Sequence, residues 1–286
     1  MTTASPGRLS PRATGLVATV ALLFVTASWG STFFLIKDLL DRVPVLDFLA
    51  IRFAIATFTL LLLFPRAVGR LSSHSRRAAL VLGALYGLGQ ILQTAGLAHT
   101  PASVSGFITG MYVVATPLFA APLLKQRIDR TTWLAVLLAV VGLGVLSLSG
   151  LSIGYGEALT FVAALLYALH IVGLGAWSRA EDAIGLTIVQ LAVITVISFA
   201  VTAPNGAVLP DRPGDWASVI YMAVVPAALA LLGQTWAQAH LPPTRTAIIM
   251  TTEPVFAALF AVRVGGRCAW AQVWPSSASA AGTTAM

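Results

Sequence analysis

Residues 93–105 read QTAGLAHTPASVS, and residues 234–246 read QTWAQAHLPPTRT. The two stretches share Gln, Thr, Ala, His, Pro and two small hydroxyl residues at matching places. A second match follows, ATPLFAA around Pro117 and TEPVFAA around Pro254, with four extra residues between the blocks in the first copy. Four residues make about one helical turn, so the helical face stays roughly in phase. These matches predict an internal repeat built from helices.

The composition of the chain is that of an integral membrane protein. Of its 286 residues, 58% are hydrophobic and 9% are charged, and this apolar excess is too large for a water-soluble globule of this size. The 17 Lys and Arg residues are spread singly between apolar runs, so they form no basic face and we expect no nucleic-acid partner. The single cysteine, Cys268, excludes an intrachain disulfide and a Cys-based metal site.

Nine apolar runs are long enough to be membrane-spanning helices, since a bilayer core of about 30 Å requires roughly 20 apolar residues. The first run follows a basic N-terminus, but it has no convincing cleavage site, and we interpret it as an uncleaved helix. Short, turn-forming connections favour one compact all-α bundle. The expected spans are 16–37, 46–64, 78–98, 103–124, 132–149, 156–177, 185–203, 216–238 and 244–262.

The repeat relates the third and fourth helices to the eighth and ninth, an offset of five. Because five is odd, the two copies enter the membrane from opposite sides, as in secondary transporters with inverted repeats. The predicted divisions are an N-terminal tail at 1–15, a first five-helix repeat at 16–150, an incomplete second repeat at 151–262 and an atypical, disordered tail at 263–286.

Basic residues in the loops predict that the N-terminus is cytoplasmic. With this orientation, eleven loop Lys and Arg residues lie on the cytoplasmic side and five on the opposite side. Most of the bias comes from the first half of the chain. We therefore expect a multi-pass protein of the plasma membrane.

The stretch from Arg263 onward departs from the repeat. A polar turn and a tenth helix should follow the ninth, but no Leu or Ile occurs after Leu259. We hypothesise a reading-frame shift near Val262, which translation of the encoding DNA in the other two frames would check; the alternative is a natural nine-helix variant with a disordered tail. Without a tenth helix, one face of the bundle would meet lipid or a partner subunit, such as a second copy in a homodimer.

Four stretches together resemble EamA-type members of the drug/metabolite transporter superfamily. The resemblance extends over about residues 20–262 and rests on the order, spacing and duplication of the stretches rather than on one motif. It implies a ten-helix bundle of two inverted five-helix repeats. It also implies movement of small metabolites or drugs, commonly outward and commonly coupled to protons or exchange. The stretches are ASWGSTFFLIKDLL (27–40), IRFAIATFTLLLLF (51–64), TPASVSGFITGMYVVATPLFAAPLL (100–124) and TEPVFAALFAV (252–262).

Glu253 and Pro254 are the first candidates for a transport site. A charge at bilayer depth costs roughly 3 kcal/mol or more, so an ionisable residue midway along the ninth helix indicates function. Pro254 removes a backbone donor and can open the helix beside the carboxyl group. Because burial disfavours the charged form of a carboxyl group, such a group can take part in proton exchange. The alternative is that Glu253 caps a helix end or forms a structural pair.

Two further ionisable residues fall inside predicted spans. His170 lies deep in the sixth helix, where it could titrate or, as we favour, form a hydrogen bond to a neighbouring helix. Arg52 lies about two turns into the second helix. It could attract an anionic group in the cavity or, as we favour, extend its long side chain to the outer interface.

Polar and aromatic residues inside the spans complete the candidates. Trp29 could stack on substrate beside the small residues 30–32 or pack on lipid or another helix; the same small stretch weakens the first helix. Gln93 and Gln234 each belong to a pair on one helical face, with Gln90 and with Gln238. Their amides could line a polar cavity or bond helix to helix.

The sequence shows no motif of an enzyme: no metal-ligand spacing, nucleophile elbow or phosphate-binding loop is found. We therefore expect no cofactor and no metal. A secondary transporter that exports small metabolites or drugs, by proton coupling or exchange, is the function predicted. The alternatives are a channel-like pore, a membrane enzyme acting on lipids, or a non-transporting membrane protein because the tenth helix is missing.

Overall fold

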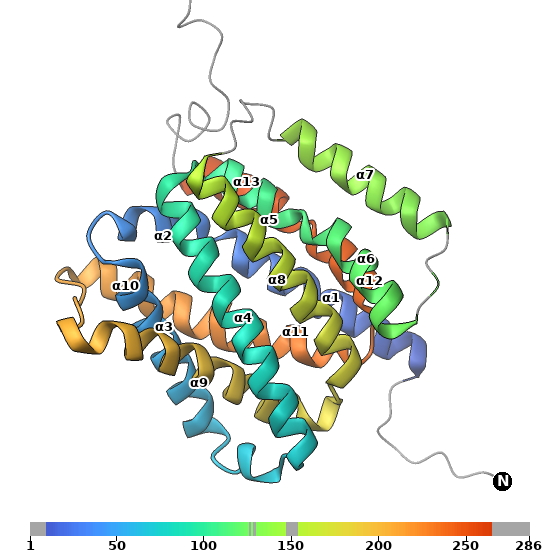
Figure 1. The fold of residues 1–286 in the computed structure, drawn as a ribbon, viewed down its shortest axis with the longest axis horizontal. Helices are drawn as coiled ribbons and strands as arrows, with labels where there is room; N and C mark the ends of the chain where they lie inside the picture. Colours follow the sequence, from blue (N-terminus) through green and yellow to red (C-terminus); the bar gives the residue numbers. More distant parts are fainter. Residues whose placement is uncertain (1–9, 126, 128–129, 147–153, 265–286) are drawn as a thin grey trace, which may run out of the picture.

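The computed structural model describes residues 10–125, 127, 130–146 and 154–264, and this part of the chain is a bundle of helices without a strand (Figure 1). All nine predicted spans are present as helical segments. Seven of them are long and apolar enough, by length and composition, to cross a membrane. The segments are α1 (Pro11–Gly30) with α2 (Phe33–Leu40), α3 (Val45–Leu63), α4 (Ser73–His99), α5 (Ala102–Gly110) with α6 (Tyr112–Leu124), α7 (Arg130–Leu146), α8 (Tyr155–Trp177), α9 (Ala183–Thr202), α10 (Pro213–Met222) with the π-helix η4 (Ala223–Leu229) and α11 (Ala230–Gln238), and α12 (Pro243–Met250) with α13 (Glu253–Val264).

The first helix starts at Pro11, earlier than predicted from apolarity, because its local sequence is a helix start. The Ser10 side chain accepts a hydrogen bond from the Ala13 backbone N–H at 3.2 Å, and proline at the first helical position loses no helical hydrogen bond. Of the two basic residues in the predicted tail, Arg8 therefore precedes the helix in the sequence and Arg12 belongs to it.

Four of the nine spans are interrupted among the described residues. The first breaks at Ser31 and Thr32, in the small stretch predicted to weaken it. The fourth breaks at Met111, the eighth contains the π-helix η4, and the ninth breaks at Thr251 and Thr252. As predicted, the ninth helix opens beside Pro254, which lies in the first turn of α13. Interrupted helices place backbone and polar side chains around a cavity rather than against lipid.

Helix packing in the interior relies on small residues. Gly83 and Gly87 of α4 face α9, and a Cβ added at Gly83 would lie 2.9 Å from the Cβ of Val193. Close approach of this kind is typical of small residues at GxxxG spacing. Large apolar side chains such as Leu62 and Val196 are exposed on the outside of the bundle, where a lipid environment would cover them.

The helices that carry Gln93 and Gln234 run through the bundle in opposite directions. At one end of the bundle, Arg42, just before α3, contacts Asp215 of α10 at 2.8 Å. At the other end, Ser75 of α4 donates to Asp182, just before α9, at 2.8 Å. Because α3 spans the distance between these ends, α4 and α10 start at opposite ends. The predicted inverted repeat requires this arrangement.

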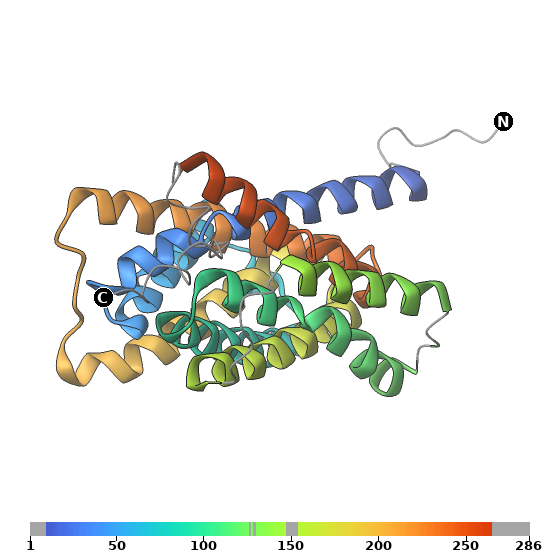
Figure 2. The same cartoon turned by 90° about the horizontal axis from the view of Figure 1, so that it is seen from above.

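Helix α7 lies at the edge of the bundle, against α5, α6 and α12 (Figures 1 and 2). It is the last described helix of the predicted first repeat. The predicted tail at 263–286 lies outside the described residues beyond Val264, and so do residues 1–9 of the predicted N-terminal tail.

Candidate functional site

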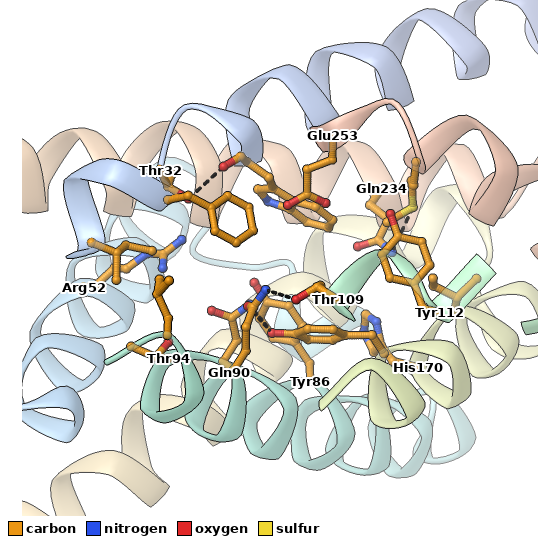
Figure 3. A pocket seen from close by; sticks show the side chains of 18 residues that line it. Thr32, Arg52, Tyr86, Gln90, Thr94, Thr109, Tyr112, His170, Gln234 and Glu253 are labelled. Carbon is orange, nitrogen blue, oxygen red and sulfur yellow. Dashed lines mark hydrogen bonds between the residues drawn. The ribbon is translucent and has the colours of Figure 1, made fainter. Parts of the chain in front are cut away.

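A pocket lies between the two halves of the chain and has a volume of about 650 Å³, including its open mouth (Figure 3). Helices before and after the middle of the chain both line it, and three of the four interrupted spans contribute side chains beside their breaks. The lining residues are Trp29, Thr32, Phe33, Ile36, Arg52, Tyr86, Gln90, Gln93, Thr94, Leu97, Thr109, Tyr112, Tyr167, His170, Ile171, Gln234, Met250 and Glu253.

Six of the seven predicted site residues line this pocket, although they come from six separate helical segments. The seventh, Pro254, is buried next to Glu253 in α13. The six are Trp29, Arg52, Gln93, His170, Gln234 and Glu253.

Glu253 is the first residue of α13, directly after the break in the ninth span. Its side chain is buried at 7% exposure, and among the described residues it forms no hydrogen bond or ion pair. The backbone next to it is held tightly: a Cβ added at Gly30 would lie 2.8 Å from the Glu253 carbonyl oxygen. The hydroxyls of Thr26 and Thr252 are 3.0 Å apart across the same contact. The backbone of Glu253 is therefore held in place, and its unbonded carboxyl group borders the pocket.

From the sequence we favoured an Arg52 side chain that extends to the outer interface, but in the structure it does not. It is 3% exposed, its Nε donates to the carbonyl of Met222 at 3.2 Å, and its guanidinium lies 5.1 Å from the ring centre of Phe53. The cause is tertiary: α3 packs against the π-helix, so the side chain finds an acceptor inside the bundle. No carboxylate of the described residues pairs with it, and the buried cation faces the pocket.

Pro226 lies in the irregular turn that follows the carbonyl contacted by Arg52. In an α-helix the N–H of residue 226 would bond to the carbonyl of Met222, but proline has no N–H. The π-helix forms around this proline, as local π turns often do at functional sites. The Pro226 carbonyl in turn accepts a hydrogen bond from Trp29 Nε1 at 2.8 Å. One irregular turn thus positions two pocket residues, so the Trp29 side chain packs on a helix and also lines the cavity.

A hydrogen-bond chain holds one wall of the pocket. Gln90 Nε2 donates to the Tyr167 hydroxyl at 2.8 Å, and that hydroxyl donates to Gln93 Oε1 at 2.8 Å. Gln93 Nε2 donates to Thr109 Oγ1 at 3.0 Å. The chain joins α4, α8 and α5. The two roles predicted for the glutamines, lining a cavity and bonding helices, are therefore both met by Gln90 and Gln93.

Other polar groups of the pocket have no partner. The hydroxyls of Tyr86 and Tyr112 and the Oε1 of Gln234 are buried without a hydrogen bond among the described residues. Leaving a polar group unpaired in the interior costs about 1–3 kcal/mol. Groups that line a cavity avoid this cost when a ligand or water pairs with them.

His170 has the structural role that we favoured. Its Nε2 lies 2.7 Å from Gln190 Oε1 on α9, and its ring centre is 5.3 Å from that of Tyr86. Its other side borders the pocket. In the part of the chain that the structure describes, no group of three or more His, Cys, Asp or Glu could hold a metal ion.

Sequence reasoning missed Tyr86, Tyr112 and Tyr167. A signal for Tyr86 was present, because residues 86, 90, 93, 94 and 97 all line the pocket and recur at helical spacing along one face of α4. Tyr112 and Tyr167 lack such a signal, since each lies in a helix whose other residues are mostly apolar.

Charged residues outside the pocket have ordinary structural roles. Glu157 accepts the Gly154 backbone N–H at 3.0 Å at the start of α8, as expected for an acidic residue at a helix N-terminus. Arg42 bridges Asp215 and Asp38. Hydrogen bonds to these two carboxylates, Asp215 first, raise the pKa of Arg42 above its usual range.

A model of the EamA-like transporter family matches residues 16–148 and, a second time, residues 154–285. The chain belongs to the EamA-like transporter family. It is a membrane transporter and not an enzyme. The predicted repeats divide at residue 150, between the two matches, whereas the second match extends to residue 285, past the predicted end of the second repeat at 262.

Two individual proteins are similar to this transporter. An uncharacterized transporter of Archaeoglobus fulgidus is 32% identical over 254 residues, which cover 87% of this chain and 78% of the relative. A protein of known crystal structure is 17% identical, with a TM-score of 0.68 over 90% of this chain and 92% of that chain. The second similarity shows that the fold is shared.

Proposed function

We propose that the chain is a secondary transporter that exports a small polar metabolite or drug across the cytoplasmic membrane in exchange for protons. The observation that carries this proposal is the shared pocket, in which both halves of the chain surround an unpaired, buried carboxyl group, Glu253. A site between two oppositely directed halves can be opened to either side by rocking one half against the other.

Interrupted helices favour a carrier over a fixed pore. The breaks at Ser31–Thr32, at Met111 and at Thr251–Thr252 all lie beside pocket-lining residues. Each break joins two short helices that can move with respect to one another, and hinges of this kind absorb the change between two states.

Glu253 is suited to couple substrate to protons. A buried carboxylate without a partner is costly, so either a proton or a cationic group must accompany it. The titratable or charged side chains that share its pocket are Arg52, Tyr86, Tyr112, Tyr167 and His170, and none is bonded to the carboxyl group. A proton and a cationic substrate group would therefore compete for Glu253. This competition produces exchange, and it predicts weaker substrate binding as the pH falls.

The proposed direction of transport depends on orientation. The connection between α3 and α4 and the start of α4 carry Arg66, Arg70, Arg76 and Arg77, which supports a cytoplasmic location for that end. In a Cys268→Ser background, an impermeant maleimide should label Asp211→Cys in intact cells and Ser73→Cys only after permeabilisation. The reverse pattern would contradict the orientation.

Transport is tested with purified protein in liposomes that contain a panel of labelled neutral, anionic, cationic and zwitterionic metabolites. We expect saturable exit of at least one compound, faster when the exterior is acidic. Glu253→Gln should abolish the effect of the proton gradient, while Glu181→Gln, at an exposed position outside the pocket, should retain it. A non-saturating current in planar bilayers would instead indicate a channel. Absence of any flux would indicate a non-transporting protein.

The homodimer expected from the sequence is part of the proposal, with a second copy covering one face of the bundle. Light scattering of the detergent-solubilised protein checks the mass, and a monomer at all concentrations would contradict it.

A further inference from the structure

We infer that the substrate is a zwitterion whose two charges lie at separate ends of an apolar body, with the anionic group bound by Arg52 and the cationic group by Glu253. The inference rests on the proposed function, because it concerns the ligand of the same pocket. It goes beyond that function because it assigns the chemical class of the substrate and says which side chain binds each of its charged groups.

Arg52 supplies the first half of the argument. A guanidinium stays charged at any physiological pH, and this one is 3% exposed with one hydrogen bond, to a backbone carbonyl. The pairs of opposite charge in the described residues involve Arg42 and not Arg52. A buried cation without a counter-charge attracts an anionic ligand and repels a purely cationic one.

Glu253 supplies the second half. It lies on α13, whereas Arg52 lies on α3, and the two side chains do not pair with each other. Figure 3 shows them on different sides of the pocket, Arg52 near Thr32 and Thr94, Glu253 near Tyr112 and Gln234. If the ligand were only an anion, a proton would have to neutralise Glu253. A ligand with both charges compensates both side chains.

The remaining lining residues fit the rest of such a molecule. Beside Glu253, the free Oε1 of Gln234 can accept a hydrogen bond from an ammonium group, for which neutral acceptors are natural partners. Other lining residues are aromatic or apolar, among them Phe33, Ile36 and Leu97, and they can contact the apolar body of such a ligand.

Four compounds of similar size separate the alternatives. 5-Aminovalerate carries both charges at opposite ends, norvaline is its isomer with the charges adjacent, valerate has only the anion, and pentylamine has only the cation. We measure exit of each from proteoliposomes and its binding to detergent-solubilised protein by thermal stabilisation. We expect 5-aminovalerate to be bound and transported at least about tenfold better than the other three.

Charge-removing variants give a readout that damage to the fold cannot imitate. Arg52→Gln should lose 5-aminovalerate and shift preference toward pentylamine, whereas Glu253→Gln should shift it toward valerate. Glu181→Gln serves as the control and should keep the preference of the unmodified protein.

Each result decides a different point. Saturable flux that favours valerate or pentylamine overturns the zwitterion and leaves the transporter proposal intact, and a preference for norvaline overturns the separation of charges. Binding of 5-aminovalerate without flux supports the assigned class and contradicts the transporter proposal. Absence of both binding and flux for the two zwitterions overturns the inference.

Discussion

The two copies of the glutamine-containing segment share a scaffold but differ in chemistry. In the first copy Gln93 Nε2 reaches Thr109, sixteen residues later, and in the second Gln234 Nε2 reaches the sulfur of Met250, also sixteen residues later. The helix break follows at Met111 in one copy and at Thr251–Thr252 in the other. The geometry is thus repeated while the partner across the helices changes from a hydroxyl to a weak sulfur acceptor at 3.8 Å, and Gln234 Nε2 also donates to Gln238 Oε1 at 3.0 Å.

The difference indicates which copy faces the ligand. In the first copy the Gln93 amide is satisfied at both ends, and the residue after the break is Tyr112. In the second copy Gln234 Oε1 is unpaired and the residue after the break is the unpaired Glu253. A satisfied network stabilises the helices, whereas an unsatisfied one is costly until a ligand pairs with it. The first copy is therefore more fully paired than the second, although the Tyr112 hydroxyl that follows its break is also unpaired.

The largest expected effect concerns the contact between Gly30 and the Glu253 backbone, next to the helix break of the second copy. Gly30→Ala places a methyl group 2.8 Å from the Glu253 carbonyl oxygen and the Ala257 nitrogen, and relieving such overpacking should cost about 1–3 kcal/mol. We expect a lower midpoint of thermal unfolding in detergent. The control in the first copy is Gly106→Ala, whose nearest neighbour would be a Phe33 atom at 3.8 Å. Equal destabilisation by both changes would contradict the expectation that the contact at Gly30 is tighter than the contact at Gly106.

The glutamines themselves sharpen the comparison. Gln93→Leu leaves the Tyr167 and Thr109 hydroxyls with fewer partners and should lower stability by about 1–3 kcal/mol. Gln234→Leu takes away the donor to Gln238 Oε1 but also removes an unpaired oxygen, so its effect on stability should be smaller and its effect on substrate binding larger. Thermal unfolding and transport affinity measured on both variants check this. If Gln234→Leu destabilised the protein more than Gln93→Leu, the assignment of roles would be reversed.

The π-helix is a second difference between the two copies. In the first copy α4 is one continuous helix, whereas in the second copy η4 separates α10 from α11. Pro226→Ala supplies an N–H that competes with Arg52 for the Met222 carbonyl. The loss of one net hydrogen bond predicts a half-saturation concentration about three- to tenfold higher, measured in proteoliposomes. Pro122→Ala, at an exposed position in α6, is the control. Unchanged affinity in Pro226→Ala would show that the proline does not position the site.

The smallest effects are expected for the partners of the glutamines. Thr109→Val removes the hydroxyl that Gln93 contacts and should cost about 1 kcal/mol. Met250→Leu conserves volume and loses only a weak contact, so we expect less than about 1 kcal/mol. Urea or thermal unfolding of the two variants in the same detergent measures the difference. A larger loss for Met250→Leu would mean that the sulfur contact stabilises more than its length suggests.

The structure also refines the repeat. The sequence match inserts four residues into the first copy between the glutamine block and the proline block. In the structure the same number of residues separates Gln93 from Met111 and Gln234 from Thr252. The extra residues therefore follow the break, and Tyr112 occupies the place of Glu253. Identity around Pro117 and Pro254 concealed this equivalence, because sequence similarity does not register where a helix bends.

The sequence by itself determined the number of spans, their repetition and most of the candidate site. Long apolar runs leave a helix as the only structure that satisfies every backbone group in lipid, and Glu253, Pro254 and the small residues 30–32 mark where helices break because of their own local chemistry. Such properties depend on neighbours along the chain.

Only the tertiary structure decided the state of each polar group. Arg52 points into the pocket because its acceptor, the Met222 carbonyl, lies 170 residues away along the chain, and Tyr167 joins the site through glutamines 74 and 77 residues distant. Whether a buried group is paired depends on what other helices bring to it. The pairing of Gln93 and the openness of Gln234 and Glu253 are therefore properties of the packed bundle.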